Sequence, residues 1–256
     1  MKQPSLENRL LSWGALIAFL IVWELIPLFE WVNPIFTSSP SRIFTAAKWL
    51  FANGFWHDIQ VSATEFGWGL LLAIVIGVPF GIALGWYERL HAIFNFFISA
   101  LYATPRVALL PILILWLGIG IKSKIAVIFL GAIFPILVNV MAGMSTIDPN
   151  LLKSARAFGA SDRQIFTTLA LPSSIPFFIA GLRLAVGRGL VGVVVGELIA
   201  STAGVGHMMR VAGATFQTDK VFVGIIILSG SGVIMTELLR AIERYFAKWR
   251  PNIQLK

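Results

Sequence analysis

The feature that most constrains this chain is a set of long stretches without any charged residue. A run of about 20 apolar residues crosses the roughly 30 Å hydrocarbon layer of a membrane as one helix. Residues 66–86 and 125–147 are the clearest such runs, since neither contains a charge. Four further candidates are residues 10–29, a segment within 92–117 that Arg106 interrupts, a segment within 177–199, and residues 221–239. We therefore expect an all-α fold, a polytopic membrane helical bundle of about six transmembrane helices that forms a single domain over residues 1–256.

The composition agrees with a membrane location. Hydrophobic residues make up 57% of the chain and charged residues only 12%, which leaves too little polar surface to cover a water-facing core. The net charge of +8 is compatible with nucleic-acid binding, but Lys and Arg in cytoplasmic loops give membrane proteins the same basic balance. No nucleic-acid partner is expected. The chain has no cysteine, and its histidines lack the spacing of a zinc site, so no bound metal is expected.

The charges of the loops predict how the chain is oriented. With an even number of spans both termini lie on one side, and Lys and Arg are more numerous in the loops of that side than of the other. Positively charged loops tend to stay in the cytoplasm. We expect both termini to be cytoplasmic in a bacterial inner membrane, with residues 10–29 kept as the first span rather than removed as a signal peptide.

Small residues recur inside the spans in a pattern that favours close helix packing. Residues four positions apart lie on one helix face, and small side chains there let a second backbone approach. Two series have this spacing: Gly77, Gly81 and Gly85, and Gly181, Ala185 and Gly189.

A long polar loop between the fourth and fifth predicted spans has its own helical pattern. Asp148 before Pro149 predicts a helix start, because aspartate caps helices and proline fits the first helical position. Gly159 predicts a stop, Ser161 can cap a second short helix, and Pro172 is expected to end it. Two short amphipathic helices on the cytoplasmic side can dock in a groove of another protein or lie on lipid headgroups.

The same loop resembles the cytoplasmic loop of the binding-protein-dependent ABC transporter permeases. That family has a Glu-Ala-Ala motif, then a glycine, then Leu-Pro. KSARAFG over residues 153–159 places Ser154 and Ala155 at the alanine positions and Gly159 at the glycine, with Leu171 and Pro172 at the family's spacing. Lys153 stands where the family has glutamate, and Leu169 where it usually has isoleucine. The blocks 108–124 and 193–209 resemble the nitrate, sulfonate and taurine branch, and the likeness covers about residues 60–245.

The resemblance implies an alternating-access pathway at the interface of two permease subunits, with the loop acting as a coupling helix. The coupling residues carried over are Lys153, Ser154, Ala155, Arg156, Phe158, Gly159, Leu171 and Pro172. The chain has no phosphate-binding GxxxxGK[ST] motif, so we expect no cofactor and no enzymatic activity in it. ATP and Mg would be bound by separate ABC ATPase subunits. The other implied partners are a periplasmic or lipid-anchored solute-binding protein and a second permease copy.

Ionisable residues inside the spans are candidates for the solute pathway, because charges in a membrane are costly unless they have a function or a partner. Arg106, Arg188 and Glu197 are the candidates for lining or gating. For Arg188 and Glu197, a buried structural pairing with another helix is an equally open reading. Glu65, Arg183 and Glu237 lie near predicted span ends and are expected to reach the membrane interface.

Two alternatives belong to other functional classes. An ion-gradient-driven secondary transporter or channel also has six spans with buried charges, but it has no need for a loop that grips an ATPase. An intramembrane serine protease requires Ser231 and His207 to lie at one depth, and His207 falls in a predicted external loop. The resemblance favours an importer, and its branch implies a small organic or inorganic anion of the nitrate, sulfonate or taurine class as solute.

Overall fold

The computed structural model describes residues 6–33 and 35–246, and within these ranges every regular element is helical. Five helices contain segments long and apolar enough to cross a membrane. These helices are α1 (Leu6–Leu28), α3 (Phe55–Trp86), α6 (Ile121–Ser145), α9 (Leu171–Ala200), which continues α8 (Asp162–Ile165), and α11 (Thr218–Phe246). The prediction of an all-α polytopic membrane bundle is confirmed.

The third predicted span is broken. Helix α4 (Glu88–Ala103) and the segment Arg106–Leu117, a 3-10 turn followed by α5 (Leu110–Leu117), meet at an angle of 89°. The break falls at Thr104 and Pro105, because a proline disfavours helical backbone in the residue before it and has no amide hydrogen to donate. The bundle therefore has six spans only if this bent pair counts as one.

Helices α3, α6 and α9 form the centre of the molecule, and glycines let them approach closely. A Cβ at Gly81 of α3 would lie 2.8 Å from the carbonyl oxygen of Leu137 in α6. A Cβ at Gly192 of α9 would lie 3.1 Å from Cα of Ile128 in α6. The prediction that the small-residue series serve helix packing is confirmed for both helices, since Gly181 likewise faces the α6 backbone.

Pro172 does not end a helix, contrary to the sequence prediction. The chain runs from α8 through a π-helical turn over Phe166–Ala170 directly into α9, where Pro172 lies in the first turn. A π turn is one residue wider than an α turn. The wider turn accommodates the proline ring at a point where the lost backbone hydrogen bond is tolerated. The helix therefore continues to Ala200.

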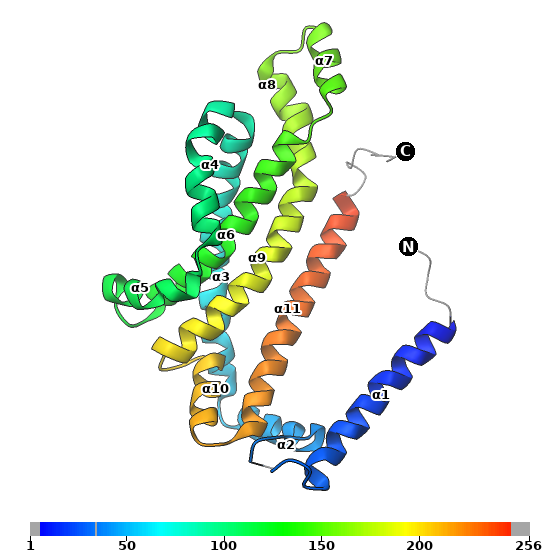
Figure 1. The fold of residues 1–256 in the computed structure, drawn as a ribbon, viewed down its shortest axis with the longest axis vertical. Helices are drawn as coiled ribbons and strands as arrows, with labels where there is room; N and C mark the ends of the chain where they lie inside the picture. Colours follow the sequence, from blue (N-terminus) through cyan, green and yellow to red (C-terminus); the bar gives the residue numbers. More distant parts are fainter. Residues whose placement is uncertain (1–5, 34, 247–256) are drawn as a thin grey trace.

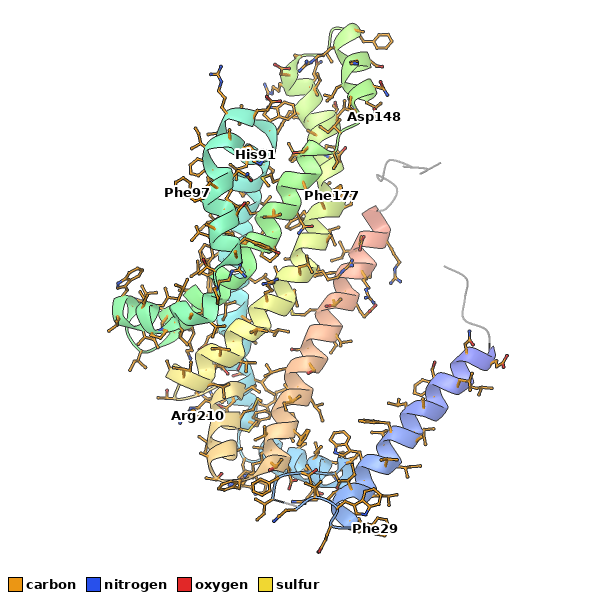
Figure 2. All side chains as sticks on the ribbon, viewed as in Figure 1. Phe29, His91, Phe97, Asp148, Phe177 and Arg210 are labelled. Carbon is orange, nitrogen blue, oxygen red and sulfur yellow. The ribbon has the colours of Figure 1, made fainter. Side chains whose placement is uncertain are left out.

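The elements outside the core gather at the two ends of the bundle (Figure 1). Helix α7 (Pro149–Ala157) and α8 project at one end, while α2 (Pro40–Ala52) and α10 (Val205–Ala214) lie toward the other. Figure 2 labels Asp148 beside α7 and Arg210 on α10. Helix α1 diverges from the bundle and meets it near its C-terminal end, where Trp23 contacts Phe222 of α11 at a ring distance of 5.5 Å.

Candidate functional site

The projecting segment α7–α8 is built from local capping interactions. The Asp148 side chain accepts the amide hydrogen of Asn150 at 2.8 Å, as its position before Pro149 predicts. Gly159 has φ of +79° and reverses the chain between the two helices. Ser161 and Gln164 form a capping box at the start of α8, in which the Ser161 amide donates to Gln164 Oε1 at 2.8 Å. The segment thus has a defined shape without help from a partner.

The outer surface of this segment is exposed. Helix α7 has no buried residue, and the side chain of Phe158 at its end is 92% exposed. The segment is held to the bundle on the α8 side, where Ile165 is buried and Phe166 contacts Trp86 at a ring distance of 5.1 Å. Of the predicted coupling residues, the six between 153 and 159 lie together on this projection. Leu171 and Pro172 lie apart from them, in the first turn of α9.

A cavity of about 600 Å³ lies halfway along the bundle, between the α4–α5 break, α6 and α9. Arg106 comes from the break and Arg188 from the middle of α9. Both guanidinium groups lie against the ring of Tyr102, with Cζ 5.2 Å from its centroid for Arg106 and 5.7 Å for Arg188. Two of the three predicted pathway residues therefore meet in one cavity.

The cavity is positively charged. The described lining residues include Arg183 besides the other two arginines, and none of these described residues is acidic. Arg183 forms an ion pair with Glu243 in the last turns of α11, and the Arg183 side chain is 30% exposed. Arg106 donates from Nη2 to the carbonyl oxygen of Tyr102 at 2.5 Å. Its Nε is buried and has no acceptor among the described residues.

Glu197, the third predicted pathway residue, does not share this cavity. It is completely buried near the far end of α9 and accepts two hydrogen bonds, from the Ser62 hydroxyl at 2.6 Å and from the Gly206 amide at 2.6 Å. The structure thus gives Glu197 the buried structural partners that were the alternative reading. We call Ser62, Glu65, Lys124 and Glu197 the buried polar cluster.

An ion pair adjoins these hydrogen bonds. Lys124 of α6 pairs with Glu65 of α3, and their side chains are 6% and 1% exposed. Lys124 also donates from Nζ to the Ser201 hydroxyl at 2.9 Å. Glu65 is therefore a core residue, and the expectation that it lies at the membrane interface is wrong. Asp58, Ser62 and Glu65 stand at helical spacing on one face of α3, a signal that could have shown a polar face before the structure.

The structure does not assemble the protease dyad within its described residues. Ser231 donates to the carbonyl oxygen of Leu228 at 2.7 Å, and Nδ1 of His207 contacts Arg210 at 3.1 Å. No cluster of metal-binding side chains occurs in the described part of the chain.

Comparisons with known proteins identify the family. The profile described as "Binding-protein-dependent transport system inner membrane component" matches residues 73–248. The chain belongs to this family. The permease is 30% identical to the taurine transport system permease protein TauC of Escherichia coli (strain K12), over 98% of this chain and 94% of that protein. It is 34% identical to the putative aliphatic sulfonates transport permease protein SsuC of Bacillus subtilis (strain 168), over 99% and 93%.

The fold agrees with this assignment. The permease matches a chain of the MetNI methionine ABC transporter, solved in inward-facing conformations, with a TM-score of 0.56 and 21% identity over 79% of this chain and 97% of that chain. The resemblance found in the motif and the flanking blocks is confirmed, and the chain is a membrane-spanning permease subunit of an ABC importer. The family implies ATPase and solute-binding partners for it.

Proposed function

We propose that this permease forms the transmembrane pathway for a small anion of the sulfonate or taurine class, driven by ATP hydrolysis on a separate subunit. The names of its relatives support the solute class. The observation that carries the coupling mechanism is the projecting segment α7–α8, which joins the ends of the two most deeply packed helices, α6 and α9. A displacement of this segment would act directly on α6 and α9, which line the cavity together with the α4–α5 break.

The coupling contact would be made by the exposed residues of α7 and the turn after it: Lys153, Ser154, Ala155, Arg156, Phe158 and Gly159. Leu171 and Pro172 would hold the base of the segment rather than touch the ATPase, because they lie at the start of α9. Lys153 is exposed on α7 and presents a positive charge where the family has a negative one. The groove that receives it on the ATPase should therefore offer an acidic or neutral surface at this point.

The remaining partners follow from this assignment. ATP and Mg would bind to the ATPase, and the permease would itself bind no cofactor and catalyse no reaction. A periplasmic or lipid-anchored binding protein would deliver the solute. A second copy of this chain would complete the pathway, and the apolar surface of α1, which the bundle leaves exposed, is available to lipid or to that copy. Both termini would face the cytoplasm of a bacterium, on the side of α7 and α8.

Within the membrane, we place Arg106 and Arg188 on the pathway. Glu197 lies roughly 13 Å further along α9 than Arg188, on the side away from α7 and α8. We propose that it holds the end of the pathway in shape.

Uptake into sealed vesicles tests the proposed function. The permease is reconstituted with its ATPase, the binding protein is supplied outside, and labelled taurine or ethanesulfonate is added. Uptake that requires ATP inside the vesicle, and that persists when proton and sodium gradients are abolished, is expected. Uptake that continues without ATP but collapses with either gradient would instead show a secondary transporter.

A further inference from the structure

The arginines of the cavity carry more positive charge than the acidic side chains of the described residues neutralise. Glu243 pairs with Arg183, but no acidic side chain lines the cavity beside Arg106 or Arg188. A charge within a membrane protein is expensive unless a counter-charge or water offsets it. Arg188 is exposed and Arg106 half-buried in the single chain, and two guanidinium groups that face one cavity favour an anion there. The described lining residues do not include an acidic one.

The buried glutamates cannot supply the missing charge. Glu65 is engaged by Lys124, and Glu197 by Ser62 and the Gly206 amide. Glu197 also stands more than two helical turns along α9 from Arg188. Both carboxylates are thus engaged away from the cavity, although Glu65 Oε2 is itself buried without a hydrogen-bond partner among the described residues.

The contacts around the two arginines leave hydrogen-bond donors for a ligand. The ring of Tyr102 offers each guanidinium a weak cation–π partner, and Phe134 offers Arg106 another at 5.3 Å. Among the described residues, Nη2 is the only donor of Arg106 with an acceptor, and the Nε of Arg106 is buried without one. Guanidinium groups present paired donors that match the oxygens of sulfonate, sulfate or phosphate groups.

The rest of the cavity suits the remainder of a small amphiphilic anion. Val127, Leu184 and Val191 give it apolar walls, and Gly187, where an added Cβ would meet nothing within 4 Å, leaves space beside them. A volume of about 600 Å³ is ample for a two-carbon sulfonate. Held by two arginines that also have aromatic partners, such an anion can be bound and released again.

We propose that Arg106 and Arg188, arranged around Tyr102, form an oxyanion site that binds the charged headgroup of the solute inside the permease. The proposal rests on the proposed function and deepens it, because the permease then selects for a negative headgroup itself instead of leaving all selection to the binding protein. A neutral solute of the same shape gains nothing from the two guanidinium groups and leaves them without a counter-ion.

Uptake by variants of the whole complex tests this site. Arg106→Gln and Arg188→Gln should each lower ethanesulfonate uptake at least about tenfold while co-purification with the ATPase stays unchanged. Arg188→Lys should retain part of the activity, because it keeps the charge but not the paired donors. Arg240→Gln is the matched control, since Arg240 is an exposed arginine of α11 that pairs with Glu237. Normal uptake by both glutamine variants overturns the proposal.

A second measurement applies if the arginine variants fail to assemble. The chain has no cysteine, so Val191→Cys introduces a single thiol into the cavity wall of an otherwise unchanged permease. Ethanesulfonate should slow its modification by a neutral maleimide several-fold, and uncharged diethyl sulfone should not. Equal protection by both compounds, or by neither, overturns the proposal.

The same thiol separates a solute from a lipid headgroup. In vesicles of phosphatidylcholine alone, protection should depend on added ethanesulfonate. Protection that appears with the anionic lipid phosphatidylglycerol and without ethanesulfonate would assign the cavity to an anionic lipid headgroup and overturn a solute site. Because wild-type ATP-driven uptake is measured separately, failure of the oxyanion site is distinguishable from failure of the proposed importer function.

Discussion

The carboxylate of Glu197 caps the first turn of α10 by accepting the amide hydrogen of Gly206 at 2.6 Å. Side chains of α3 accept the hydrogen bonds of the two preceding amides: Gly204 donates to Asp58 at 2.7 Å and Val205 to the Ser62 hydroxyl at 2.9 Å. The free amides at a helix start favour negative charge. The start of α10 therefore stabilises the negative charge of Glu197, as Lys124 stabilises that of Glu65.

Replacing Glu197 should destabilise the permease. Glu197→Ala leaves the Ser62 hydroxyl and the Gly206 amide without their shared acceptor in a dry environment, which we expect to cost about 2–3 kcal/mol of unfolding free energy. The measurement is the thermal unfolding midpoint of the detergent-solubilised protein. Glu237→Ala is the control, because Glu237 is exposed and its pair with Arg240 should contribute less than about 1 kcal/mol. Equal shifts in the two variants would contradict the capping role.

Replacing one partner of the Lys124–Glu65 ion pair should destabilise the protein more than replacing both partners. Lys124→Met leaves the Glu65 carboxylate buried and unpaired, with an expected loss of about 3–5 kcal/mol. The double variant Lys124→Met/Glu65→Leu should recover most of this loss, because it leaves no unpaired charge. Unfolding midpoints of the two single variants and the double variant give the coupling directly. If the double variant loses as much stability as the two single variants together, the two residues do not stabilise the protein as a pair.

Replacement of Gly81 by a residue with a side chain should destabilise the protein, whereas replacement of Gly67 in the same helix should be tolerated. A Cβ at Gly81 meets the Leu137 carbonyl at 2.8 Å, while a Cβ at Gly67 meets nothing within 4 Å. We expect Gly81→Ala to cost about 1–3 kcal/mol by forcing α3 and α6 apart. Gly67→Ala should be neutral or slightly stabilising, because alanine favours helix more than glycine does. The comparison requires only expression level and thermal midpoint, and similar values for both would refute the close approach of the two helices.

Phe158 should matter for ATPase binding and not for folding. It is almost completely exposed at the end of α7, and exposed aromatic residues that become buried at interfaces often carry much of the binding free energy. Phe158→Ala is expected to weaken ATPase binding by about 2 kcal/mol, with an unchanged unfolding midpoint. Binding can be titrated with the purified ATPase. Phe96→Ala, which removes an exposed phenylalanine of α4, should bind normally, and a normal titration of Phe158→Ala would exclude it from the contact.

The sequence predicts the membrane spans well because the absence of charge over some 20 residues is a local property. The same criterion places the start of the second span too late. Helix α3 begins at Phe55, and its first three turns contain Asp58 and Glu65, whose charges look like loop residues until their partners on α6 and α10 are known. Lys124 directly precedes the uncharged run 125–147, so its charge also looks like that of a loop residue.

Side chains that meet across the bundle are the part that sequence reasoning could not place. The cost of a charge in a membrane span marks both Arg106 and Arg188 in the sequence, but only the bend between α4 and α5 brings Arg106 to the face of α9 that carries Arg188. The same argument marks Glu197, which lies outside the cavity and is hydrogen-bonded to Ser62 and Gly206. The cost of a buried charge predicts that a partner exists, and it does not say which helix supplies it.

The π turn over Phe166–Ala170 sets the direction in which α7 and α8 face. Each residue of an α-helix advances the chain by about 100° around the helix axis, and a π turn contains one residue more than an α turn. Deleting one residue from this turn would restore a regular helix and rotate everything before it by about 100° relative to Arg188. The angle between the ATPase-facing surface and the cavity is thus fixed by a single inserted residue, and a one-residue deletion would leave both surfaces intact but misaligned.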